Sequence, residues 1–101
     1  MEHTRVSFVL GHHQEQASVV YCEQGQPSLL VTDLTPFHPQ SHLWPDQPGD
    51  VGTVRWNGGD AAVGPCRMGV ISPEGRLFVD QDIPVKRGAE GWTFVVVHPL
   101  A

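Results

Sequence analysis

The fold of this chain is decided by two stretches of its sequence, Asp33-Leu34-Thr35-Pro36-Phe37-His38-Pro39 and Gln47-Pro48-Gly49-Asp50-Val51-Gly52-Thr53-Val54. The first stretch follows an apolar, strand-sized run and ends among prolines, which fix φ and interrupt regular structure. The second passes through a Gly-Asp turn into another apolar run. Together they predict a strand, a proline-rich excursion and a return into a second strand.

Short apolar runs, rich in β-branched and aromatic residues and bounded by Gly, Pro, Asn or Asp, fill the rest of the chain. No window of helical length keeps its apolar residues at helical spacing. Asn57-Gly58 and Pro73-Glu74-Gly75 are turn sequences. The runs predict strands at Val6–Leu10, Ala17–Cys22, Ser28–Thr32, Val51–Trp56, Ala61–Val63, Arg67–Ile71, Arg76–Val79 and Gly91–His98.

This pattern predicts a single all-β domain over residues 1–101, a small Greek-key β-barrel. A chain of 101 residues is long enough to bury one core of its own. The last strand is rich in valine, and an exposed edge on such a strand would invite pairing with other chains. We therefore expect closure of the barrel to cover that edge.

Composition limits the classes of function. No apolar run is long enough to span a membrane and the first residues lack a signal-peptide pattern, so we expect a cytoplasmic protein with no membrane partner. The formal net charge is −5, and the acids outnumber the single base, Arg5, in residues 1–52. Dedicated nucleic-acid binders carry a basic surplus, so any RNA contact here is expected to be local. Cys22 and Cys66 are expected to be reduced thiols, with a disulfide as the alternative.

The two opening stretches resemble the N-terminal β-barrel of the free-standing alanyl-tRNA editing proteins and of the editing region of alanyl-tRNA synthetases. Thr35-Pro36-Phe37 and Gln47-Pro48-Gly49-Asp50 carry the resemblance, and Val63–Val70 and Lys86-Arg87-Gly88 extend it over most of residues 28–98. It implies a barrel similar to the second domain of translation elongation factors. It also implies a role in translation, with the acceptor end of tRNA as a partner.

The chain departs from that family at two points. Where the family has a run of glycines, this chain has the bulkier Gln40-Ser41-His42-Leu43-Trp44-Pro45-Asp46, which prevents a close approach of the backbone to RNA. In the family, a following domain with zinc-binding His-x-x-x-His and Cys-x-x-x-His pairs hydrolyses mischarged tRNA, and the 101 residues hold no such domain. The resemblance therefore implies a non-catalytic module that binds an aminoacyl-tRNA end or a separately encoded partner, such as a hydrolytic domain on another chain.

The candidate binding residues lie on the excursion and its return, and comprise Thr35, Phe37, His38, His42, Trp44, Gln47 and Asp50. Trp44 lies in a polar, proline-rich loop, where an aromatic ring is a candidate contact for a partner or an unpaired base. Because prolines restrict φ, we also expect residues 36–48 to form an ordered loop.

Two alternatives stay open. His38 and His42 have the spacing of zinc ligands, and a third histidine would complete a metal-dependent hydrolase, with His12, His13 and His98 available. The surrounding prolines oppose the helix that this spacing needs, so histidines without a metal, and no cofactor, are the preferred interpretation. The second alternative is a homo-oligomeric structural protein that uses Trp44 and the apolar last strand.

Other nucleophiles have little support in the sequence. No serine lies in a Gly-x-Ser-x-Gly elbow. Cys66 stands beside Arg67, which could lower its pKa, but a cysteine on a short strand is interpreted as an inert core thiol. The sequence therefore predicts no catalytic residue.

Overall fold

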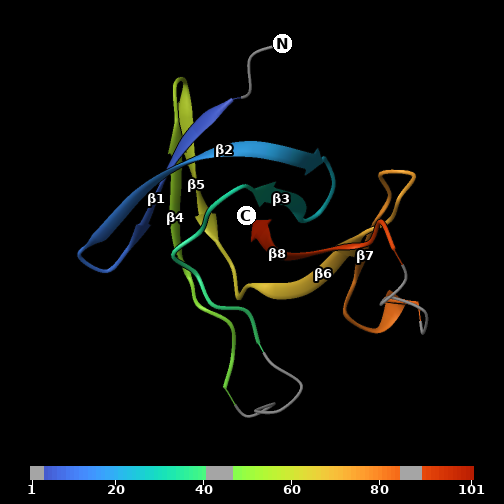
Figure 1. The fold of residues 1–101 in the computed structure, drawn as a ribbon. Coiled ribbons are helices and arrows are strands. Elements are labelled where there is room, and N and C mark those ends of the chain that lie inside the picture. The colour runs from blue at the N-terminus through green and yellow to red at the C-terminus, as the bar shows by residue number, and fades with distance from the viewer. Residues whose placement is uncertain (1–3, 41–46, 85–89) are drawn as a thin grey trace.

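The computed structural model describes residues 4–40, 47–84 and 90–101 as an all-β fold (Figure 1). Among these residues the only helix is a 3₁₀ turn, Asp80–Asp82. The strands are β1 (Arg5–Leu10), β2 (His13–Glu23), β3 (Ser28–Thr32), β4 (Gly52–Trp56), β5 (Gly59–Val63), β6 (Arg67–Ile71), β7 (Leu77–Val79) and β8 (Thr93–Leu100). The predicted all-β class is confirmed.

Six of the strands close into an antiparallel barrel. They are hydrogen-bonded in the order β3-β2-β1-β4-β5-β8, and pairing of β3 with β8 completes the ring. Strands β1 to β3 follow one another, and β4 returns after a long connection to lie beside β1, which is the Greek-key arrangement. The predicted Greek-key barrel is therefore confirmed.

Strands β6 and β7 lie outside this ring and extend it on one side (Figure 1). β6 pairs with the first part of β8, from Arg67 opposite Val97 to Ile71 opposite Thr93. The last part of β8 pairs instead with β3 and β5. One long strand thus belongs to two sheets.

The β1–β2 hairpin is longer than its sequence suggests. Leu10 pairs with His13 across a turn in which Gly11 has a φ of +61°, a conformation that glycine adopts without strain. Residues His13 to Gln16 are polar and so do not form an apolar run, yet each pairs with a residue of β1. β2 therefore begins four residues before the predicted Ala17.

The barrel core is filled from alternate strand positions and from one residue outside the strands. On β1, Val6 and Phe8 are buried and alternate with the more exposed Ser7 and Val9, as expected for a strand with one face inward. Phe37 comes from the proline-rich excursion, is 2% exposed and meets Phe8 edge to face at 5.2 Å between ring centroids. The cluster consists of Val6, Phe8, Ala17, Leu30, Phe37, Val54, Val63 and Cys66.

The described residues contain no helix long and apolar enough to cross a membrane.

Candidate functional site

Asp50 joins the two stretches that define the excursion. Its side-chain Oδ2 accepts a hydrogen bond from the His38 N–H at 2.9 Å, and its own N–H donates to the His38 carbonyl at 2.9 Å. Its carbonyl accepts from the Cys66 N–H at 3.2 Å. Asp50 therefore has a structural role in holding the entry and the exit of the excursion together.

Two glycines of the return stretch are required by close packing. A Cβ added to Gly49 would lie 2.6 Å from the Cys66 nitrogen, and one added to Gly52 would lie 2.7 Å from the Phe37 ring. Real Cβ atoms do not approach other atoms so closely. The two glycines of Gly49-Asp50-Val51-Gly52 are thus explained by the packing of the barrel, whatever the chain binds.

Thr35 and His98 form a buried polar chain in the core. The His98 Nδ1 lies 2.8 Å from the Leu30 carbonyl, which can only accept, so Nδ1 carries a hydrogen. The Nε2 lies 2.8 Å from the Thr35 Oγ1, which in turn accepts from the Phe37 N–H at 3.1 Å. Burial lowers the pKa of His98 below its ordinary value, although the hydrogen bond to Leu30 opposes the shift. The ring is therefore neutral, and its Nε2 accepts the hydroxyl hydrogen of Thr35.

A hydroxyl beside an imidazole that a third group orients is also the arrangement of a nucleophile and its base. Here His98 is 0% exposed and its ring lies between Phe8, stacked at 4.7 Å, and Phe37. The Thr35 oxygen already serves as an acceptor for a backbone N–H. These contacts fit a structural role for both residues, in which every polar atom of the pair is satisfied.

Cys66 is an unreactive core thiol. It is 0% exposed, and burial, with a smaller effect from the Asp50 charge, raises its pKa to about 12. Its Sγ lies 3.8 Å from the Gly64 carbonyl. Both cysteines are free, and Cys22 is exposed on β2.

The remaining predicted site residues are only partly placed. His38 and Gln47 are exposed at the two ends of the excursion. His42 and Trp44 lie outside the described residues, as does most of the loop predicted to be ordered. Within the described ranges, no three His, Cys, Asp or Glu side chains gather where they could hold a metal ion. The zinc alternative at His38 and His42 stays a prediction.

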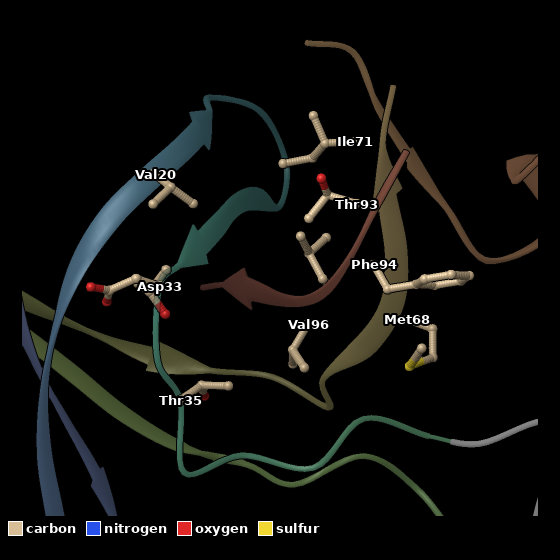
Figure 2. A pocket seen from close by; sticks show the side chains of 10 residues that line it. Val20, Asp33, Thr35, Met68, Ile71, Thr93, Phe94 and Val96 are labelled. Carbon is tan, nitrogen blue, oxygen red and sulfur yellow. The ribbon is translucent and has the colours of Figure 1, made fainter. Parts of the chain in front are cut away.

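A groove of about 590 Å³ opens on the side of the barrel, and sequence reasoning did not predict it. Figure 2 shows Asp33 and Thr35 along one side of it and Thr93 and Val96 along the other. Its lining is mainly apolar and is formed by Val20, Thr32, Asp33, Thr35, Met68, Ile71, Thr93, Phe94, Val95 and Val96.

The groove lies where β3 and β8 separate. Their pairing runs from Ser28 opposite Leu100 to Leu30 opposite His98 and ends there. Beyond Leu30 the chain stays with β2 instead: the Asp33 N–H donates to the Ser18 carbonyl at 3.0 Å, and the Ser18 N–H donates to Asp33 Oδ1 at 2.8 Å. The same path carries the chain on to Thr35 and the buried Phe37. The excursion that completes the core thus also opens the groove.

Strand β2 contributes an irregularity to this groove. The register between β2 and β3 shifts between Val19 and Tyr21, which leaves Val20 as the extra residue of a bulge. Bulges redirect a side chain, and Val20 is 51% exposed and lines the groove. Phe94, on the opposite strand, is 57% exposed. Two large apolar side chains are therefore accessible along one depression.

The expectation that closure of the barrel covers the last strand holds for only part of β8. Residues from His98 to Leu100 pair with β3, whereas Thr93 to Val97 pair with β6, and Thr93 to Val96 border the groove. The sequence carried one signal of this arrangement. Phe94-Val95-Val96-Val97 is continuously apolar, as in strands buried on both faces. These four residues nevertheless lie outside the part of β8 that pairs with β3 and β5, which is His98 to Leu100.

In comparisons with known proteins, no family model, no curated protein and no solved structure matches this chain. The resemblance to the alanyl-tRNA editing proteins, the likeness to an elongation-factor domain and the roles in translation and tRNA binding stay predictions.

Proposed function

We propose that this barrel is a non-catalytic binding module that holds a protein partner in the groove between β3 and β8. The observation that carries the proposal is the groove itself, an apolar depression of about 590 Å³ beside a strand whose pairing stops short. Ligand sites are typically concave and mainly apolar, with a few polar groups for orientation. Thr35, Asp33 and Thr93 supply such groups here.

The composition of the lining favours a protein over a nucleic acid. Phe and Met are enriched at the centres of protein interfaces, and Phe94 and Met68 lie in this groove. Among the described residues that line the groove, the one ionised side chain is Asp33, whose pKa is lowered mainly by the hydrogen bond from the Ser18 N–H. A carboxylate repels phosphates, and the chain carries a net charge of −5.

Matched aspartate variants test the proposal. Phe94 and Val51 are almost equally exposed, at 57% and 54%, but only Phe94 lines the groove. We expect Phe94→Asp to weaken binding of a partner protein, purified from the source cells, by about tenfold or more, since a charge in an apolar contact is costly to desolvate. Val51→Asp should leave the affinity within about twofold.

A short single-stranded RNA with the sequence of a tRNA acceptor end serves as the competing probe. Partner binding that is insensitive to Phe94→Asp would contradict the proposal. Binding of the RNA at low salt, with no effect of Phe94→Asp, would instead favour the tRNA-binding role implied by the resemblance.

A further inference from the structure

We infer that the groove receives an extended segment of the partner, which adds as a strand to the open edge of β8 and hydrogen-bonds to the backbone of Phe94 and Val96. This inference rests on the proposed function, because it specifies how the same groove holds a protein. Its evidence is the direction in which successive backbone groups of β8 face.

A hydrogen bond between Pro99 and Gly64, the residue after β5, sets that direction at one end of β8. In an antiparallel strand the N–H and C=O of one residue face the same neighbour, and those of the next residue face the opposite side. The Pro99 carbonyl accepts from the Gly64 N–H at 2.8 Å, so Pro99 faces β5. Val97 and Val95 then face the same side, where β6 lies, and Val96 and Phe94 face the groove.

Contacts at the far side of β6 give the same result independently. The Ser72 N–H donates to the Arg76 carbonyl at 2.8 Å, which directs Ser72 toward β7. By alternation Ile71 and Gly69 face β8, where their partners are Thr93 and Val95. Two separate hydrogen bonds thus assign the odd residues of β8 to β6 and leave the even ones facing the groove.

The groove side of β8 is the side on which β3 pairs farther along. Leu30 is opposite His98, and the same register would place Thr32 opposite Val96 and Leu34 opposite Phe94. β3 does not continue there because Asp33 is hydrogen-bonded to Ser18 of β2. The backbone of Phe94 and Val96 therefore continues a β ladder from which the intramolecular strand has departed.

This opening is held by fixed contacts. The Thr35 hydroxyl is bonded to the buried His98, and Phe37, two residues later, is locked in the core. The Thr32 hydroxyl donates to the Leu34 carbonyl at 2.6 Å, so that carbonyl has a partner within its own segment. Moving residues 32–35 across to β8 would break these bonds, which keeps the edge available to another chain.

The chemistry of the groove specifies the occupant. An open edge with unpaired N–H and C=O groups recognises any extended backbone, and pockets for alternate side chains add selectivity. The apolar lining favours small aliphatic side chains at every second position, and the Asp33 carboxylate favours a lysine or arginine beside them. The net charge of −5 opposes the pairing of two copies of this chain, so the occupant is a basic, aliphatic segment of a different protein.

The direct test is an NMR titration with a short capped peptide of alternating valine and threonine that has a lysine at each end. The control peptide has the same sequence with N-methyl groups on every valine and threonine, which removes strand pairing and keeps the side chains. We expect the first peptide, at millimolar concentration, to slow exchange of the Phe94 and Val96 amide hydrogens by about tenfold or more, and the control to have no effect. Protection of Val95 and Val97 in place of Phe94 and Val96 would overturn the inference.

Two variants separate strand addition from side-chain docking. Phe94→Pro removes the N–H that faces the groove and breaks no bond to β6, whereas Phe94→Thr keeps that N–H and removes the same ring. We expect Phe94→Pro to weaken peptide binding about tenfold or more and Phe94→Thr less than about threefold. The Val96 amide reports binding in both variants, and thermal melts confirm that each is folded.

The remaining outcomes distinguish strand addition at β8 from the broader proposal that the groove binds a protein partner. Equal weakening by the proline and threonine variants would mean that the ring, and not the backbone edge, makes the contact, and would overturn strand addition while leaving the proposed function intact. Absence of peptide binding, together with partner binding that ignores Phe94→Asp, would overturn both. A molecular mass that rises with concentration, and that Phe94→Pro abolishes, would assign the edge to a second copy and contradict the occupant inferred here.

Discussion

The Thr35 hydroxyl oxygen lies 2.8 Å from the Nε2 of His98, and this contact joins the proline-rich excursion to the last strand of the barrel. The two residues are 63 positions apart in the chain. Thr35 places Phe37, two residues later, in the core, while Asp33, two residues earlier, is bonded to Ser18 of β2 where the pairing of β3 with β8 has ended. The stability of the barrel and the presence of the groove therefore depend on the same segment.

Loss of the Thr35 hydroxyl should destabilise the fold. Thr35→Val leaves the His98 Nε2 and the Phe37 N–H without their partner, and an unsatisfied buried group costs about 1–3 kcal/mol. Thr35→Ser keeps the hydroxyl and serves as the matched control. Urea denaturation should show the valine variant to be less stable than the serine variant by at least about 1 kcal/mol. Equal midpoints for the two would show that the hydroxyl contact contributes nothing.

Stability should fall as the pH is lowered through the titration range of His98. Because burial lowers its pKa in the folded state, the unfolded chain takes up a proton near pH 6.5 that the folded chain does not bind. The contribution of His98 to the free energy of unfolding is therefore complete above pH 6.5. It decreases below that pH, by at most about 1.4 kcal/mol per pH unit. His98→Phe keeps a ring and removes the titration, so its stability should depend less on pH in that window. Identical pH profiles for the two proteins would contradict a neutral buried His98.

Gly52 should not tolerate a side chain. Its Cβ would collide with the Val9 carbonyl oxygen and lie 2.7 Å from the Phe37 ring, whereas the nearest neighbour of a Cβ on Gly64 would be the Pro99 carbonyl oxygen at 3.6 Å. Overpacking of a core costs about 1–3 kcal/mol. We therefore expect Gly52→Ala to lower the free energy of unfolding by at least about 1 kcal/mol more than Gly64→Ala does. Chemical denaturation of the two variants in parallel checks this difference, and a more damaging Gly64→Ala would show that the packing at Phe37 is wrong.

The two cysteines should differ in reactivity. The Cys66 pKa is raised to about 12 and the residue is buried, whereas Cys22 is exposed. At pH 8 a thiol reagent such as Ellman's reagent should modify Cys22 alone in the folded protein and both residues after denaturation. Mass spectrometry of the peptides identifies the modified site. Rapid modification of Cys66 in the folded protein would contradict its assignment as a core thiol.

Much of the fold was predictable because the strands carry local signals. Ser28–Thr32 and Arg67–Ile71 have the predicted boundaries, since each is an apolar run between turn residues. The polar start of β2 was missed because its pairing with β1 is not recorded in hydrophobic periodicity. The sequence predicted a turn at Gly49-Asp50 and a binding role for Asp50, but it could not show their contacts with Cys66 and His38, which are distant in the sequence.

The groove could not be predicted from the same signals. It depends on where β3 stops pairing with β8, and that point is set by Asp33 bonding to Ser18 of β2, while Thr35, two residues later, bonds to the buried His98. Both are contacts between residues far apart in the chain. Sequence reasoning instead placed the binding site in the loop that carries Trp44, and the role of that residue stays a prediction.

Amide hydrogen exchange along β8 in the free protein tests most directly whether the edge of this strand at Phe94 and Val96 is open. If the ladder between β3 and β8 ends at Leu30 and His98, the amides of Phe94 and Val96 face the groove and should exchange about tenfold or more faster than those of Val95 and Val97, which bond to β6. The four residues are neighbours on one strand, so each serves as a control for the others. Uniform protection from residue 94 to residue 97 would show that the edge is closed, and would contradict the account.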